Sequence, residues 1–166
     1  MEAHWKFRFM NLAKHISEWS KDPSRKVGAV IVDESRKIVA TGYNGFPAGI
    51  EDNNRYDDRE EKYKYVVHAE MNSIYNACLN GVSPKGATLF VWGLPVCSEC
   101  AKGIIQVGIK NVKIPALSMT DPKWNESFNL SNEMFKEAGI EVEILYEHPE
   151  PYVPKSLEDL RKHIQQ

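Results

Sequence analysis

Two short segments of the chain carry residues that bind metals and move protons. The first is His68-Ala69-Glu70, and the second is Cys97-Ser98-Glu99-Cys100. Histidine nitrogen and cysteine sulfur are common zinc ligands, and three protein ligands leave a fourth tetrahedral position for water, as in catalytic sites. Two thiolates balance the charge of Zn²⁺, and a water held there loses a proton near neutral pH. We therefore expect a catalytic zinc on His68, Cys97 and Cys100.

Glu70 is the candidate for proton transfer. It follows His68 by two residues, so a helix does not force it onto the ligand face, and it can stand beside the water and shuttle its proton. A Cys-x-x-Cys by itself also fits a redox motif or half of a structural zinc site. A non-catalytic, zinc-stabilised binding module is therefore the alternative from another class. A structural site needs no carboxylate beside an open position, so Glu70 favours the enzyme.

The elements that must position these groups follow from the hydrophobic pattern. Apolar residues at three- and four-residue spacing predict helices over 2–20, 68–79, 98–107 and 124–138. Short apolar runs predict strands over 27–32, 38–43, 87–92, 112–114 and 140–146. Both motifs then open a helix, where free N–H groups and the helix dipole favour a thiolate. The order predicts an α/β fold, a mixed five-stranded sheet with helices on both faces.

Other segments carry less chemistry. We expect one domain over 1–146 and a proline-rich tail with a short helix over 147–166. Residues 44–64 form a long, charged loop that can contain a helical turn, and loops of this length are commonly functional. Cys78 lies at an apolar helical position, so we predict a buried core thiol. Trp19 continues the apolar face of the first helix and is expected in the core.

Composition excludes several classes of protein. The chain has 166 residues and a net charge of -2, with 21 Lys and Arg against 23 Asp and Glu. Proteins that bind long nucleic acids are usually more basic, whereas a binding site for a small anion needs only one or two cationic side chains. No apolar run approaches the ~20 residues that span a bilayer, and the first residues lack a signal-peptide pattern. We expect no membrane partner and a cytoplasmic location. An odd count of 3 cysteines argues against a disulfide framework.

The motifs together resemble the deoxycytidylate (dCMP) deaminase family of the cytidine deaminase superfamily. The His-Ala-Glu and Cys-x-x-Cys pair is typical of the superfamily. Ser20-Lys21-Asp22-Pro23, Gly42-Tyr43-Asn44-Gly45-Phe46-Pro47 and Glu99-Cys100-Ala101-Lys102 resemble the deoxycytidylate branch. The resemblance implies a three-layer αβα cytidine-deaminase-like fold. It also implies zinc-dependent hydrolysis of dCMP to dUMP and ammonia, which serves the supply of dTTP.

The resemblance also implies roles in substrate binding. Asn44 would hydrogen-bond the sugar or base, and Arg25, with Lys26 as a second candidate, would hold the 5′-phosphate, since the planar guanidinium makes two charge-assisted bonds. Ala69 and Cys97 would offer backbone groups to the ring. Trp124 is a candidate to stack on the base, with packing beneath its loop as the alternative.

Partners and alternatives follow from the same resemblance. It implies a homo-oligomer, often a hexamer, that is activated by dCTP or inhibited by dTTP with Mg²⁺. Within enzymes, the alternatives are deaminases of another small cytosine nucleoside or nucleotide and, less favoured by the charge balance, of a polynucleotide. Two segments depart from the family pattern: Val96 is an extra residue between Pro95 and Cys97, and the loop over 115–124 is unusual. Both put contacts with the base in question.

Overall fold

The computed structural model describes residues 1–116 and 125–146 of the chain. The strands are β1 (Gly28–Val32), β2 (Ile38–Tyr43), β3 (Thr88–Trp92), β4 (Asn111–Pro115) and β5 (Glu141–Leu145). The helices are α1 (Ala3–Ser17), α2 (Arg59–Tyr65), α3 (Ala69–Leu79), α4 (Ser98–Gln106) and α5 (Asn125–Glu137), with a 3-10 turn, η1 (Asn54–Tyr56). Trp124 and the tail over 147–166 lie outside the described residues, so the expected domain boundary stays a prediction.

The strands form one mixed sheet in the order β2-β1-β3-β4-β5. Strand β1 is antiparallel to both of its neighbours, β2 and β3, whereas β3, β4 and β5 run parallel. Every residue of β1 is buried, which explains why its sequence is a continuous apolar run rather than an alternating one. Among the described residues, no helix has the length and apolar character that crossing a membrane requires.

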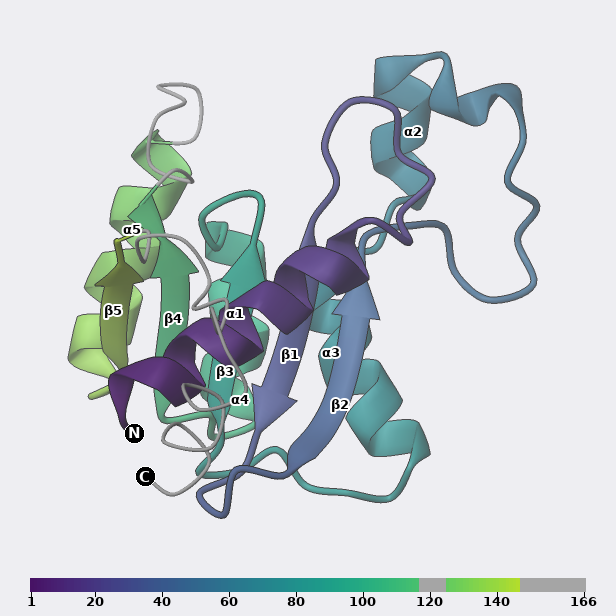
Figure 1. Ribbon diagram of the computed structural model, residues 1–166. Helices are drawn as coiled ribbons and strands as arrows, with labels where there is room; N and C mark the ends of the chain where they lie inside the picture. Colours follow the sequence, from purple (N-terminus) through teal and green to yellow (C-terminus); the bar gives the residue numbers. More distant parts are fainter. Residues whose placement is uncertain (117–124, 147–166) are drawn as a thin grey trace, which may run out of the picture.

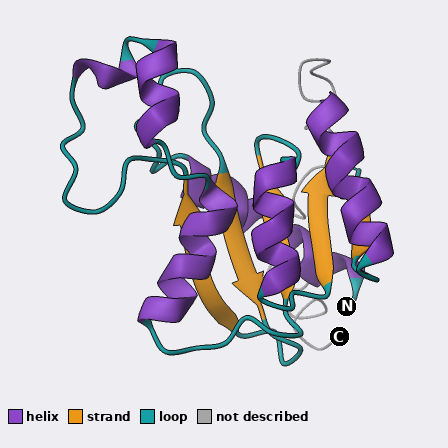
Figure 2. Cartoon of the chain, turned by 180° about the vertical axis from the view of Figure 1, so that it is seen from behind, coloured by secondary structure: helices purple, strands orange, loops and turns teal. Residues whose placement is uncertain are grey.

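Helices cover both faces of this sheet. Helix α1 lies across one face, and α3, α4 and α5 lie on the other, as the two opposite views show (Figures 1 and 2). Alternate residues of the central strands face the two layers: Ile31 packs in the core under α3 to α5, and Val30 in the core under α1. The expected α/β arrangement with helices on both faces is confirmed. Parallel β3-α4-β4 and β4-α5-β5 units bring the helix starts to one edge of the sheet.

Two apolar residues that we expected in the core are exposed. Helix α1 ends at Ser17, so Trp19 lies beyond it and is 54% exposed. Cys78 is exposed because α3 turns Ala69, Ser73 and Ala77 toward the sheet, and Cys78 is one position around the helix from Ala77. The prediction of a core thiol at Cys78 was therefore wrong, and the apolar spacing in 68–79 overstated the buried face.

The expected long loop is a folded lobe. We call residues 46–66 the insertion lobe; it contains η1 and α2 and projects from the sheet (Figure 1). Two backbone hydrogen bonds between Gly45 and Val67 close its base. Asp58 caps α2 by accepting from the N–H of Glu61, and the rings of Phe46 and Tyr56 stack 4.2 Å apart. Residues 51–64 are mostly charged and have no apolar periodicity, so the sequence pattern did not predict this folded structure.

An ion-pair network joins the far edge of the sheet to α1. Lys113 on β4 and Lys6 on α1 both donate to the carboxylate of Glu143 on β5. Burial raises the pKa of Glu143, but the hydrogen bonds and charges of the two lysines outweigh it, so the pKa lies below its ordinary value. A carboxylate with a depressed folded pKa stabilises the fold above its unfolded pKa. That contribution is lost as the pH falls through the folded pKa.

We therefore expect the Glu143→Gln variant to show a pH-dependent loss of stability. At pH 7 it should lower the free energy of unfolding by about 1–2 kcal/mol, because the buried Lys113 loses the nearer of two carboxylates and keeps the exposed Glu141, 3.7 Å away. The difference should shrink as the pH falls through the ordinary pKa of an unfolded glutamate, about 4.3, and then through the lower folded pKa of Glu143. Urea denaturation at pH 7 and pH 3.5 measures both values. A difference that does not change between them would contradict the expectation, and Glu137→Gln, on an exposed position of α5, is the control.

Candidate active site

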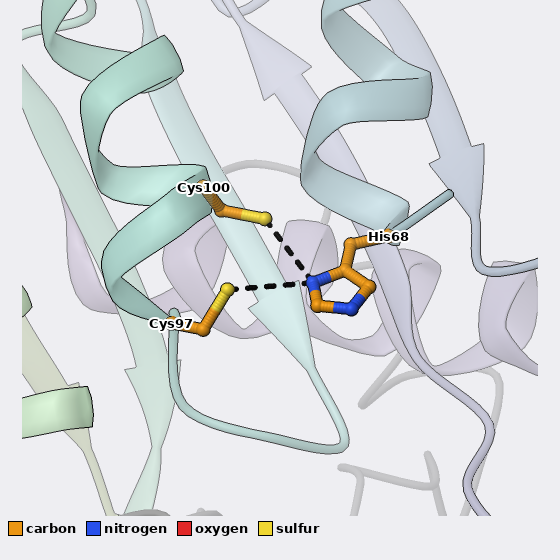
Figure 3. A group of neighbouring side chains, drawn as sticks. All are labelled: His68, Cys97 and Cys100. Atoms are coloured by element: carbon orange, nitrogen blue, oxygen red, sulfur yellow. Dashed lines mark hydrogen bonds between the residues drawn. The ribbon is translucent and has the colours of Figure 1, made fainter. Parts of the chain in front are cut away.

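The three predicted metal ligands come together between two helix starts. His68 directly precedes α3, Cys97 directly precedes α4, and Cys100 lies in the first turn of α4. Neither His68 nor Cys97 caps its own helix with its side chain; both side chains point into the space between the helices instead (Figure 3). The helices approach closely because α4 has a glycine there: a Cβ at Gly103 would lie 2.6 Å from the Met71 sulfur of α3.

The distances between the ligand atoms fit a tetrahedral zinc. His68 Nδ1 lies 3.4 Å from the sulfur of Cys97 and 3.4 Å from that of Cys100. All three ligand atoms lie within 4.8 Å of one another. A tetrahedral ion with ordinary zinc–nitrogen and zinc–sulfur bond lengths would set nitrogen and sulfur about 3.6 Å apart. One nitrogen and two sulfurs at this spacing therefore match the donor set and size of a catalytic zinc site.

The ligand side chains influence one another's protonation strongly. The hydrogen bond with Cys97 raises the pKa of His68 to about 9, against the opposing effect of burial. The hydrogen bond with Cys100 lowers the pKa of the Cys97 thiol, while the same contact and burial raise the pKa of Cys100. One thiolate is thus already stabilised beside an imidazolium. Zinc binding must release the remaining protons, because cysteine binds zinc as a thiolate and histidine binds it as a neutral imidazole.

Glu70 lines the same site as His68 and Cys97. It is 3% exposed and belongs to the first turn of α3. Burial raises its pKa to about 7. A carboxyl group with a pKa near neutrality can both accept and return a proton at physiological pH, which suits general acid–base catalysis.

A pocket opens above the ligands. It contains about 540 Å³ of space between side chains, part of it continuous with solvent, and its wall includes His68, Glu70 and Cys97. Several residues expected to bind substrate also line it: Arg25, Asn44 and Ala69. Lys26 is not among the described lining residues, and its ammonium donates to the Glu18 carbonyl over 3.5 Å.

Asn44 contacts protein groups on several sides. Its amide oxygen accepts from the N–H of Val27 over 2.8 Å, and its amide nitrogen donates to the Arg25 carbonyl over 2.9 Å. We call residues 22–27, which these bonds hold, the Asp22 loop. The structure thus gives Asn44 a part in shaping the pocket wall. Its expected bond to the sugar or base stays a prediction.

The extra residue before Cys97 is anchored rather than loose. Val96 is 1% exposed, and its carbonyl accepts from the hydroxyl of Ser131 over 2.7 Å. The N–H of Ser98 donates to the hydroxyl of Ser127 over 2.9 Å. We call Ser127 and Ser131 the α5 brace, because these two serines of α5 hold the backbone on both sides of Cys97. The extra residue Val96 therefore does not loosen the backbone that carries Cys97.

The segment that leads from β3 to Cys97 begins with a glycine whose backbone conformation other residues rarely adopt. Gly93 has a φ of +110°, and a Cβ there would lie 2.4 Å from the Lys26 carbonyl. Only glycine allows the chain leaving β3 to turn so close to the Asp22 loop. The two loops that form the pocket wall are thereby packed against each other.

The family resemblance also implied that the loop Asp22-Pro23-Ser24-Arg25 lines the site, and Asp22, Ser24 and Arg25 do line the pocket. Among the polar lining residues, sequence reasoning missed Lys62 and Tyr63. Lys62 and Tyr63 belong to a charged run of the insertion lobe, and no spacing in that run predicts a position beside the metal ligands.

Comparison with known proteins places these features in a family. Residues 3–116 match the family model described as the cytidine and deoxycytidylate deaminase zinc-binding region. The chain belongs to this family. A member of a zinc-binding deaminase family needs a metal-capable ligand group, and His68, Cys97 and Cys100 are such a group.

Individual deaminases are similar to this chain over most of its length. A protein of Aliivibrio fischeri named as an uncharacterized deaminase in the luxG 3′ region is 41% identical over 145 residues, which cover 86% of this chain and 94% of that protein. The deoxycytidylate deaminase of Mus musculus is 40% identical over 142 residues, covering 82% and 76%. The crystal structure of dCMP deaminase from cyanophage S-TIM5 in complex with dCMP and dUMP aligns with a TM-score of 0.72 at 27% identity, covering 87% and 99%. The cytidine-deaminase-like fold is thereby confirmed.

Proposed function

We propose that the protein catalyses the hydrolytic deamination of dCMP to dUMP and ammonia. The observation that carries the proposal is that a zinc-ligand group, a buried carboxyl and an arginine line one pocket: His68 and Cys97, then Glu70, then Arg25. Relatives named deoxycytidylate deaminase and the solved complex with dCMP and dUMP support the choice of substrate. Small cytosine nucleosides are the nearest competing substrates.

The proposed chemistry divides between the metal and Glu70. Zinc, when bound by His68, Cys97 and Cys100, supplies the Lewis acidity that makes water a nucleophile near neutral pH. Glu70 accepts the proton of the attacking water and delivers it to the ring nitrogen beside the reacting carbon. It then takes the second proton of the former water, now on the hydroxyl of the reacting carbon, and delivers it to the amine, which leaves as ammonia while the carbonyl forms. Burial of Glu70 helps, because a carboxyl group with a pKa near 7 exchanges protons in both directions at little cost.

Arg25 is the proposed ligand of the 5′-phosphate. It lies in the wall of the pocket, and its backbone N–H is held by the carboxylate of Asp22 over 3.3 Å. A guanidinium at the pocket wall makes paired, charge-assisted hydrogen bonds with phosphate oxygens. The remaining expectations for substrate contact, Ala69 and Cys97 with the ring and Trp124 with the base, belong to the same proposal.

The Arg25→Ala variant is expected to lose the preference for the nucleotide. The contact is worth about 1.5–3 kcal/mol, so the ratio of kcat/KM for dCMP over deoxycytidine should fall roughly tenfold to a hundredfold, mainly on dCMP. Arg25→Lys should recover part of the loss, because it keeps the charge without the planar fork. Steady-state assays on both substrates measure the ratio. An unchanged ratio would mean that another cation binds the phosphate. The Lys26→Ala variant, assayed on the same two substrates, tests the next candidate.

The proposed function is tested by ammonia release from a panel of cytosine and adenine nucleosides and nucleotides. We expect dCMP to give the highest kcat/KM. Equal rates on dCMP and deoxycytidine would overturn the assignment of substrate while leaving a zinc deaminase. Absence of ammonia from every member of the panel, with zinc bound, would favour a binding module instead.

We also propose a homo-oligomer, a hexamer by family resemblance, that responds to dCTP and dTTP with Mg²⁺. The insertion lobe gives such a regulator a folded, charged surface near the pocket, since its Lys62 and Tyr63 line the pocket wall. Location in the cytoplasm is part of the same proposal. Small-angle scattering with and without each nucleotide tests assembly and response together, and a monomer that ignores both would refute them.

A further inference from the structure

A buried ion pair connects the insertion lobe to the pocket. The ammonium of Lys62 on α2 donates to a carboxylate oxygen of Asp22 over 2.9 Å. The two side chains are only 3% and 5% exposed, and both residues line the pocket. Removing two charges from water is costly and often gives no net stability. A pair that is kept in such a place calls for an explanation beyond stability.

The carboxylate of Asp22 organises the Asp22 loop, residues 22–27. The oxygen that accepts from Lys62 also accepts from the backbone N–H groups of Ser24, over 2.8 Å, and Arg25, over 3.3 Å. Its other oxygen lies 3.4 Å from the amide nitrogen of Asn44. Asp22 therefore fixes the backbone that carries Arg25, and the ammonium of Lys62 is the cation that pairs with this buried carboxylate.

The charges explain why the pair matters for an anionic ligand. An unpaired Asp22 carboxylate in the pocket wall would repel a phosphate. The ammonium of Lys62, 2.9 Å from that carboxylate, offsets its charge, so the pair adds no net repulsion beside Arg25.

We propose that Lys62 is a positioning residue that sets the preference for a nucleotide over a nucleoside, by holding Asp22 and, through it, the loop that carries Arg25. The inference rests on the proposed function, since it presupposes a 5′-phosphate on the substrate. It also gives the insertion lobe a direct link to the site: a displacement of α2 would move Lys62 away from Asp22.

The test compares Lys62→Met with the wild-type protein on dCMP and on deoxycytidine. Methionine keeps the apolar stem and removes the charge. We expect kcat/KM for dCMP to fall at least about tenfold, through KM, while that for deoxycytidine changes less than about twofold. Inhibition by dUMP should weaken by a similar factor, and zinc content should not change. Lys62→Arg should recover part of the preference.

Two further variants separate positioning from folding. Lys113→Met removes another buried lysine that pairs with a carboxylate, Glu143, away from the pocket, so it should lower stability and leave the substrate ratio unchanged. The double variant Lys62→Met, Asp22→Asn removes the orphaned charge. It should fold even if Lys62→Met alone does not, and it should still lack the preference for dCMP.

The outcomes distinguish the inference from the function beneath it. If the wild-type protein prefers dCMP and the Lys62 variants lose activity equally on both substrates, Lys62 is only structural and the inference is overturned. The same holds if the folded variants keep the wild-type ratio. If the wild-type protein has no preference for dCMP, the proposed substrate and the inference fail together.

Discussion

The Glu70→Gln variant should bind zinc and substrate as the wild-type protein does and lose nearly all turnover. The amide has almost the same shape as the carboxyl and can still form hydrogen bonds in the buried site. It cannot take a proton from water and return it to the ring and the leaving amine. A single general acid–base role contributes about 10²–10⁴-fold, and a group that acts twice contributes more. We therefore expect kcat for dCMP to fall by at least about 10³-fold.

Ammonia release at saturating dCMP measures this loss, and elemental analysis measures the zinc. The matched control is Glu99→Gln, because Glu99 occupies the first turn of α4 as Glu70 occupies that of α3, but its side chain is 78% exposed and pairs with Lys102. The control should keep most of its activity. A Glu70→Gln variant with full zinc and more than about a tenth of wild-type kcat would remove Glu70 from the proposed proton transfer.

Loss of a metal ligand is the second large expected effect. Cys100→Ser replaces a buried thiol with a poorer zinc ligand, so zinc affinity should fall by more than the ~10–100-fold that loss of an outer-shell partner costs. Activity should disappear with the metal. The melting temperature should also fall, because zinc binds the folded chain and stabilises it by mass action. Chelator treatment of the wild-type protein should reproduce both losses, and added zinc should reverse them.

Cys78→Ser provides the control for this experiment. Cys78 is exposed on α3 and lies outside the ligand group, so its removal should leave zinc content, activity and melting temperature unchanged. Retention of a full equivalent of zinc and of activity in Cys100→Ser, measured after dialysis against a chelator, would argue against a site built on His68, Cys97 and Cys100. A zinc loss in Cys78→Ser would argue the same.

The sequence alone predicted the fold because the pattern of its elements is simple. Short apolar runs between helical patterns indicated the strands, and the motifs at the starts of α3 and α4 implied that His68 and Cys97 would meet. Such a meeting follows from topology, because parallel units bring helix starts to one edge of a sheet. Local patterns thus contained the information that placed the metal ligands.

Other features depend on contacts that local patterns do not contain. Apolar spacing on α3 did not separate Ala77, which is buried, from its neighbour Cys78, which is exposed, because the width of the covered stripe depends on the partner element. Lys62 looked like one charge in a solvated run, and its burial follows only from Asp22, far away in the chain. Val96 was recognised as an extra residue, but its anchor comes from α5.

The two serines of the α5 brace are synthesised after the metal ligands whose backbone they hold. Because ribosomes make a chain from its N-terminus, the imidazole of His68 and the thiols of Cys97 and Cys100 are synthesised before Ser127 and Ser131 exist. The nascent chain therefore holds a complete ligand set before the helix that fixes the Val96 carbonyl can dock. In that interval the thiols are open to any thiol-seeking ion, copper included. The α5 brace thus determines when the backbone around Cys97 reaches its final position, as well as where that position is.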